Sequence, residues 1–307
     1  MKVIIAGGSG LLGSALTAAL AAERHEVVVL TRRSRAGDIS PVRYVQWTPD
    51  AGSGPWTSVL DGAAAVVNLA GESIGDGRWT AARKQRIESS RVQATRHLVE
   101  AIAGLAAPPP VLLSGSAVGY YGPCGDEIVT EQSPVGDDFL ARVCAAWEAE
   151  AARAASAAVR VVRLRTGLVL DKTGGALPRM LLPFKLGAGG PIGSGRQYWP
   201  WIHIDDWVSF VRWAIVTPGL SGPFNVTAPD PRPNAEFARS LGRAMRRPAL
   251  IPTPGFALRI ILGEMAEGLL LSGQRAVPAK ALDARFSFRY PHLEDALAAL
   301  FGRPPVV

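Results

Sequence analysis

The stretch VIIAGGSGLLG, residues 3–13, predicts how the chain begins to fold. Its first four residues form a short continuous apolar run, which is typical of a strand buried on both faces of a parallel sheet. A glycine-rich turn follows at once, and the segment SALTAALAAE after it predicts a helix. The order of strand, glycine turn and helix at the start of a chain indicates a dinucleotide-binding unit.

The glycines of this turn have the spacing G-x-x-G-x-x-G. The early glycines let the backbone bend tightly beside a pyrophosphate, and the last one lets the helix pack closely on the strand. The helix N-terminus adds free N–H groups and the positive end of its dipole. We therefore expect the turn to hold dinucleotide phosphates; the alternative is a purely structural turn. The residues concerned are Gly7, Ser9, Gly10, Leu11, Leu12 and Gly13.

A second strand, predicted at residues 26–30, ends in Thr31, Arg32 and Arg33. A site selective for NAD usually places an acidic side chain here, on the ribose 2′-hydroxyl, whereas an arginine suits a 2′-phosphate. The two arginines therefore favour NADP as the cofactor. The alternative is that both are solvated side chains in a loop.

A third buried strand is predicted within residues 63–72, and it ends in Asn68, Leu69, Ala70 and Gly71. Small side chains at this point would let the adenosine side of a cofactor lie against the backbone. A helix predicted over residues 80–105 follows. This alternation of strands and helices predicts the α/β class, with a doubly wound parallel sheet.

The second half of the chain predicts a smaller region beside the sheet. Residues 159–170 are valine-rich and strand-like, and a glycine- and proline-rich stretch with aromatic side chains follows them. Such a loop is suited to substrate contacts, for which Lys185, Arg196 and Trp199 are the candidates. We expect a cofactor-binding core and a smaller substrate-binding lobe. The core comprises residues 1–166 and about 204–228, and the lobe about 167–203 and 229–307.

The composition of the chain indicates which kinds of ligand and partner to expect. The net charge is +7, but the arginines are dispersed and no nucleic-acid-binding motif accompanies them, so we expect small anionic ligands and no nucleic acid. Two cysteines and four scattered histidines have no metal-ligand spacing, and we expect no metal. The most apolar late stretch is interrupted by charges, which argues against a membrane partner. With no signal peptide at the start, we expect a cytoplasmic protein.

Several motifs along the chain resemble one known group of proteins. They are GGSGLLG, TRR, NLAGE, SGSAVGYYG, GSGRQYWPWIHIDD and GPFNVTAP, together with LLLSGQRAVPAKAL near the end. This set resembles the epimerase family protein group, an atypical branch of the extended short-chain dehydrogenases/reductases related to sugar-nucleotide epimerases. The resemblance covers nearly the whole chain. It implies a Rossmann-type core, NADP as cofactor, a small C-terminal lobe over it and, as in related dimers, a possible homodimer.

The resemblance also assigns roles to individual residues. Arg91 falls where related enzymes keep a polar residue near the cofactor. Ser114, at the same strand end as the catalytic position, is also expected to contact the cofactor. Ser116 matches the catalytic serine, which hydrogen-bonds a substrate oxygen. Tyr120 and Tyr121 follow it closely and could act on the same oxygen.

The usual catalytic pair is missing. Related reductases carry Tyr-x-x-x-Lys on the helix after the serine, where the lysine lowers the tyrosine's pKa and the tyrosine moves the substrate proton. None of the five tyrosines here has a lysine four residues later, and Leu140 and Cys144 occupy the aligned places. An altered mechanism would use Tyr120 or Tyr121 as the acid, tuned by a cation such as Lys185 or Arg83. The alternative is that these rings only pack.

Two functions follow from these observations. The first is an NADP-dependent oxidoreductase or epimerase-like enzyme acting on a small hydroxyl- or carbonyl-bearing substrate, for which the resemblance suggests a sugar nucleotide. The second is a non-catalytic sensor or scaffold that binds NADP(H). The missing pair favours the sensor, and the retained serine favours the enzyme.

Overall fold

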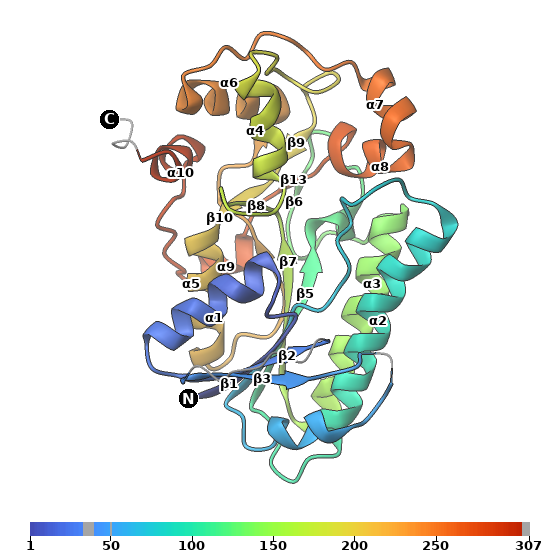
Figure 1. Ribbon diagram of the computed structural model, residues 1–307, viewed down its shortest axis with the longest axis vertical. Coiled ribbons are helices and arrows are strands. Elements are labelled where there is room, and N and C mark those ends of the chain that lie inside the picture. Colours follow the sequence, from blue (N-terminus) through green and yellow to red (C-terminus); the bar gives the residue numbers. More distant parts are fainter. Residues whose placement is uncertain (33–39, 50, 303–307) are drawn as a thin grey trace.

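A computed structural model describes residues 1–32, 40–49 and 51–302 of the chain. Its centre is a seven-stranded sheet in the order β11-β7-β5-β4-β1-β2-β3, in which every neighbouring pair is parallel (Figure 1). The predicted doubly wound sheet is confirmed. Its strands are β1 (Lys2–Ala6), β2 (Glu26–Thr31), β3 (Val42–Gln46), β4 (Ala65–Asn68), β5 (Val111–Ala117), β7 (Arg160–Thr166) and β11 (Gly222–Val226).

The direction of the strand order reverses between β1 and β4. From β1 the chain moves outward through β2 to β3, and it then returns to place β4 on the other side of β1. In open α/β sheets such a reversal leaves a crevice at the carboxyl ends of the two strands, where ligands bind. The turn after β1 and the loop after β4 therefore border the expected ligand crevice.

Two pairs of helices cover the two faces of the sheet (Figure 1). On one face, α1 (Leu11–Ala22) and α5 (Ile204–Val216) pack on the sheet through residues such as Leu16 and Trp207. On the other face, α2 (Ala81–Ala103) and α3 (Phe139–Ala152) pack through residues such as Leu98. Both sheet faces are thus buried, which is why the strands read as continuous apolar runs.

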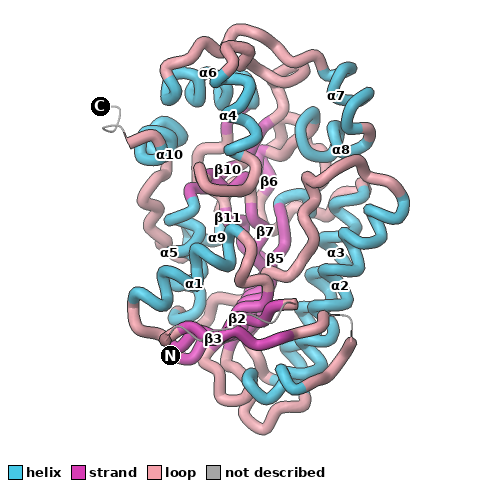
Figure 2. Tube along the Cα trace, in the orientation of Figure 1, coloured by secondary structure: helices cyan, strands magenta, loops and turns pink. Residues whose placement is uncertain are grey.

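A smaller region lies beyond the carboxyl ends of the strands (Figure 2). Its own core contains Trp201, Phe237 and Leu297. Every helix in the described part of the chain is too short or too polar to cross a membrane. The strands beyond the main sheet are β6 (Ile128–Val129), β8 (Leu168–Leu170), β9 (Tyr198–Trp199), β10 (Trp201–His203), β12 (Arg232–Pro233) and β13 (Arg275–Ala276). The remaining α-helices are α4 (Leu177–Lys185), α6 (Asn234–Met245), α7 (Gly255–Leu262), α8 (Glu264–Ala266), α9 (Ala279–Asp283) and α10 (Leu293–Leu300). Short helical turns of other types are η1 (Pro55–Leu60), η2 (Val118–Tyr121), η3 (Arg153–Ala157) and η4 (Glu267–Leu271).

The strand-like stretch at residues 159–170 is divided in the structure. It forms β7 in the main sheet and then β8, which pairs with β10 in a separate two-stranded sheet. The break falls at Gly167, where an added Cβ would lie 2.6 Å from the carbonyl oxygen of Pro200. The close approach of these two backbones redirects the chain, and an apolar pattern alone does not reveal such an approach.

The C-terminal elements are joined to β11 and to the segment around β6 by strand pairing and hydrogen bonds. Strand β13 pairs in parallel with β6. The side-chain amide of Asn225 on β11 donates to the carbonyl of Val277, 2.9 Å away, and the backbone N–H of Lys280 faces the carboxylate of Glu131 at 3.3 Å. These contacts fix the end of the chain beside the strands that carry the candidate site.

Candidate cofactor and active site

The glycine turn after β1 has the close backbone approaches that its sequence predicts. Gly7 has a φ of +79°, and a Cβ there would lie 2.6 Å from the carbonyl oxygen of Leu69, at the end of β4. A Cβ on Gly13 would lie 2.5 Å from the carbonyl oxygen of Gly7, so helix α1 crosses directly over the turn. Only glycine fits the first position without strain and the second without a clash.

The N-terminus of α1 is suited to an anion. Its N-cap residue, Gly10, offers no side-chain hydrogen bond, and its first turn carries no acidic residue. The first backbone N–H groups and the positive end of the helix dipole are thus left to a ligand. Thr31 is buried at the end of β2, and Arg32 is exposed directly after it. These residues fit a phosphorylated dinucleotide; Arg33 lies outside the described residues.

The end of β4 is held from behind by α2 and α3. The side-chain amide of Asn68 donates to Thr95 Oγ1 at 2.8 Å, and its Oδ1 accepts from the N–H of Ala70 at 3.2 Å. Trp147 Nε1 also donates to Thr95 Oγ1, at 2.8 Å. The amide of Asn68 therefore shapes the loop that continues through Leu69 to Gly71. Ser114, the register partner of Asn68 on β5, is fully buried.

Arg91 projects from α2 toward this loop. Its Nη1 donates to the carbonyl of Ile87 and its Nη2 to the carbonyl of Glu72, both at 2.9 Å. The guanidinium carbon lies 5.4 Å from the ring centroid of Trp147 on α3, and a Cβ on Gly71 would come within 3.0 Å of it. Burial lowers the pKa of Arg91, although arginine remains charged at neutral pH.

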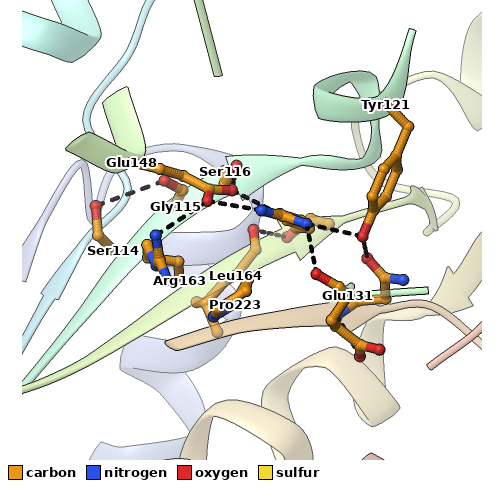
Figure 3. Close-up of polar contacts among 12 residues, drawn as sticks. Ser114, Gly115, Ser116, Tyr121, Glu131, Glu148, Arg163, Leu164 and Pro223 are labelled. Atoms are coloured by element: carbon orange, nitrogen blue, oxygen red, sulfur yellow. Dashed lines mark hydrogen bonds and ion pairs between the residues drawn. The ribbon is translucent and has the colours of Figure 1, made fainter. Parts of the chain in front are cut away.

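Ser116 is bound to a buried ion pair (Figure 3). Its Oγ donates to Glu148 Oε1 on α3 at 2.7 Å. Arg165, its register partner on β7, donates to the same carboxylate through Nε at 2.7 Å and Nη2 at 2.9 Å. Glu148 and Arg165 each expose only 3% of the side chain, and Arg163 adds a third cationic contact at 3.4 Å. Burial opposes the charge of Arg165, but Glu148 outweighs it and the pKa is raised.

The two tyrosines contact the other side of Arg165. Tyr121 donates to Asn225 Oδ1 at 2.6 Å and accepts from Arg165 Nη1 at 3.0 Å. Burial raises the pKa of Tyr121 to about 12, although the nearby guanidinium favours the ionised form. The guanidinium carbon of Arg165 lies 3.5 Å from the ring centroid of Tyr120. Both tyrosines therefore contact Arg165 directly, and Ser116 is linked to it through Glu148.

That cation corrects an expectation from the sequence. Lys185 is exposed at the C-terminal end of α4, and Arg83 is paired with Glu72 at 2.6 Å. Neither contacts the tyrosines through a hydrogen bond or ring contact, whereas Arg165 does. The reason is topological, because the parallel pairing of β5 and β7 places Arg165 opposite Ser116.

Sequence reasoning missed the charged partners in this network. Glu131 extends it, since its backbone carbonyl accepts from Arg165 at 3.4 Å and its Oε1 accepts from the backbone N–H of Asn225 at 3.0 Å. The signal was present in VRVVRLRT, where arginines alternate with apolar residues in a strand expected to be buried. A buried charge requires a partner, so an arginine in that strand implies a carboxylate nearby. It does not reveal which one.

The two positions of the missing catalytic pair are apolar or inert. Leu140 packs in a small core with Trp79 and Met265, and its Cβ lies 3.3 Å from where a Cβ on Gly119 would stand. Cys144 is buried one turn later, and burial raises the pKa of its thiol to about 11. Neither side chain supplies an acid or a cation at neutral pH.

The three candidate substrate contacts do not come together. Lys185 and Arg196 are both exposed, the first on α4 and the second in the loop before β9. Trp199 is buried, and its ring centroid lies 5.5 Å from that of Phe237 in the core of the smaller region. Trp199 therefore has a packing role in this arrangement, because the β9–β12 pairing turns it inward instead of leaving it on a loop.

The strand order, the glycine turn at the reversal point and the helix that follows it define an NAD(P)-binding protein of Rossmann type. More specifically, the chain belongs to the NAD dependent epimerase/dehydratase family, whose model matches residues 3–226. Residues 253–300 match a second model, a domain of unknown function, DUF1731. The family resemblance drawn from the motifs is confirmed.

Individual relatives match over the full length. The chain is 43% identical over 302 residues to an epimerase family protein of Mycobacterium bovis, with 98% of each chain covered. It is 41% identical over 303 residues to the epimerase family protein YfhF of Bacillus subtilis, again with 98% of each covered. The crystal structure of human epimerase family protein SDR39U1 with NADPH is similar, with a TM-score of 0.88 and 35% identity, covering 98% of this chain and 99% of that one.

Proposed function

We propose that this protein binds NADP(H) and uses it as an oxidoreductase or epimerase-like enzyme on a small substrate that carries a hydroxyl or carbonyl group. The observation that carries the proposal is the glycine turn at the β1/β4 reversal, followed at the end of β2 by Arg32. An acidic residue at that place would favour NAD, and the arginine favours a 2′-phosphate. The NADPH in the structure of human SDR39U1 supports the same cofactor.

The residues that would hold the cofactor lie along the carboxyl edge of the sheet. Gly7, Gly10 and the first turn of α1 would bind the pyrophosphate, Arg32 the 2′-phosphate, and the Leu69–Gly71 loop the middle of the molecule. Bound nicotinamide supplies or accepts a hydride.

Side chains of this protein must bind the substrate oxygen and its proton. Because Glu148 is paired with Arg165, it accepts the hydroxyl hydrogen of Ser116. With that hydrogen committed, Ser116 Oγ can only accept, and a substrate hydroxyl would share its lone pairs with the neighbouring Cys144 thiol. The arrangement favours an alcohol group as the partner of Ser116, and a sugar nucleotide would supply one.

A second candidate is a sensor or scaffold that binds NADP(H) without turnover. Two observations favour it. Leu140 and Cys144 leave the usual pair without acid or cation, and the polar groups of Ser116 and Tyr121 already have protein partners.

Cofactor titration tests the shared part of both candidates. We expect native protein to bind NADPH at least about tenfold more tightly than NADH, because a 2′-phosphate adds a charge-assisted contact. Arg32→Ala should abolish that preference. Arg43→Ala, which removes an exposed arginine from the neighbouring strand β3, should leave it unchanged. A native preference for NADH would overturn the proposal.

A turnover assay then separates the two candidates. NADP⁺ reduction is followed with a panel of alcohols and sugar nucleotides, and NADPH oxidation with the matching carbonyl compounds. Turnover that falls at least about a hundredfold in Ser116→Ala, with cofactor affinity retained, supports the enzyme. Tight NADPH binding without turnover on any member of the panel supports the sensor.

A further inference from the structure

The helix that follows β5 lacks the positive charge that related enzymes place beside the nicotinamide ribose. In this chain Cys144 occupies the lysine's position on α3, and its thiol is buried and neutral. A positive charge is nevertheless present on the neighbouring helix. Arg91 extends from α2 across Trp147, which lies three residues after Cys144 and therefore on the same face of α3.

Among the described residues Arg91 has no salt-bridge partner, unlike Arg83 and Arg86, which lie on the same helix. Arg83 and Arg86 are both paired with Glu72, at 2.6 and 3.7 Å, whereas Arg91 bonds only backbone carbonyl groups. A guanidinium has five N–H groups. In the described part of the chain, Arg91 makes two hydrogen bonds and no ion pair. The Glu72 carboxylate attracts Arg91 but does not contact it directly. A partly buried guanidinium that no carboxylate contacts is costly, and it is expected where a ligand supplies the missing contacts.

The order of the strands indicates which end of a cofactor Arg91 would meet. Arg32 stands at the end of β2, whereas Arg91 lies between the end of β4 and helix α3, beside β5. The path from β2 through β1 and β4 to β5 crosses three strand spacings, on the order of 14 Å. A dinucleotide lying along this edge with its 2′-phosphate on Arg32 has its nicotinamide end at β4 and β5.

We propose that Arg91 binds the nicotinamide-ribose end of the cofactor and takes the place of the lysine that α3 lacks. The proposal rests on NADP(H) being the cofactor. Two features support it together: Gly71 leaves room for the guanidinium at the end of β4, and Trp147 supports its other face. The charge of the usual catalytic pair has thus moved from one helix to its neighbour, while Leu140 has replaced the acid with an apolar contact.

Binding measurements with two ligands test this proposal without any turnover. NADPH carries the nicotinamide ribose, and 2′,5′-ADP carries only the adenosine end with its 2′-phosphate. We expect Arg91→Gln to weaken NADPH at least about tenfold, since a bond to a charged donor is lost, and to change the affinity for 2′,5′-ADP less than about twofold. Arg91→Lys keeps the charge and should stay within about threefold of native protein.

Two controls make the outcome specific. Arg32→Ala should weaken both ligands, because both carry the 2′-phosphate. Arg96→Ala removes an arginine from the same helix, one that pairs with Glu150, and it should weaken neither.

The possible failures are distinguishable. Native affinity for NADPH in Arg91→Gln, or equal loss of both ligands at melting temperatures near native, would overturn the role of Arg91 and leave the proposed function standing. Native protein that binds neither ligand would remove the proposed function itself.

Discussion

Replacing Glu148 by glutamine tests whether the buried ion pair beside Ser116 holds α3 on the sheet. The carboxylate accepts one hydrogen bond from Ser116 and two from Arg165, all between 2.7 and 2.9 Å. An amide of nearly the same shape keeps one acceptor oxygen but no charge. The guanidinium of Arg165, 97% covered by protein, then has no counter-ion in its place.

The expected cost is large for a single substitution. Removing one partner of a buried pair typically costs about 3–5 kcal/mol in the free energy of unfolding. With an unfolding entropy of about 2 cal/mol/K per residue, a chain of this length loses about 1.5 °C per kcal/mol, so the melting temperature should fall by about 5–8 °C.

Urea unfolding followed by circular dichroism, with thermal melts beside it, measures this cost. Glu150→Gln is the matched control, because Glu150 lies on the same helix but its partners Arg96 and Arg153 are half exposed. That pair should contribute less than about 1 kcal/mol. The double variant Glu148→Gln, Arg165→Met should lose less than the sum of the single changes. A Glu148→Gln protein as stable as the control would refute the reasoning.

Three further results are expected. Gly62→Ala, at a positive φ but with no atom within 4 Å, should lose about 1–3 kcal/mol from backbone strain alone. Gly7→Ala adds a clash with the Leu69 carbonyl, so it should lose more stability than Gly62→Ala, and most of its NADPH affinity. Equal losses of stability in the two variants would contradict the clash. Burial raises the pKa of Tyr121 to about 12, so the unfolded chain ionises this residue at lower pH than the folded protein, and stability should fall as pH rises from about 10 to 12. The fall should be smaller in Tyr121→Phe, which urea unfolding at pH 9 and 11 measures. Equal falls in the native protein and the variant would contradict the raised pKa. Finally, the two cysteines should differ in reactivity. Burial raises the pKa of Cys144, the thiol that remains in Cys124→Ser, to about 11. A thiol reagent should therefore label Cys124→Ser at least about a hundredfold more slowly than Cys144→Ser, in which Cys124 remains.

The features that could be predicted from the sequence are those encoded within short stretches. VIIAGGSGLLG contains both a buried strand and the backbone conformation of the turn, because glycine alone tolerates the approach that Gly7 makes to Leu69. Helix α2 was expected over residues 80–105 and spans Ala81–Ala103, since its apolar positions repeat with the helical period. The position of Arg32, exposed directly after β2, could also be read from the sequence, whereas its role toward a 2′-phosphate stays a prediction.

The features that could not be predicted depend on segments distant in sequence. Arg165 and Glu148 are 17 residues apart and lie on a strand and a helix, so no local pattern links them. The inward turn of Trp199 depends on the pairing of β9 with β12, which residues 232–233 supply. Residue type alone does not show which arginine or lysine lies beside Tyr121. The β5–β7 register is needed to identify Arg165.

The pairing of β6 with β13 limits where this chain can be truncated. A chain shortened before residue 253 would lose the carbonyl that receives the Asn225 amide and the N–H that faces Glu131, together with the partner strand of β6. The truncated protein would then contain buried polar groups without hydrogen-bond partners. The nucleotide-binding half is therefore not a free-standing building block, and a chimaera that exchanges C-terminal segments between relatives must carry the 128–131 stretch and residue 225 along with them.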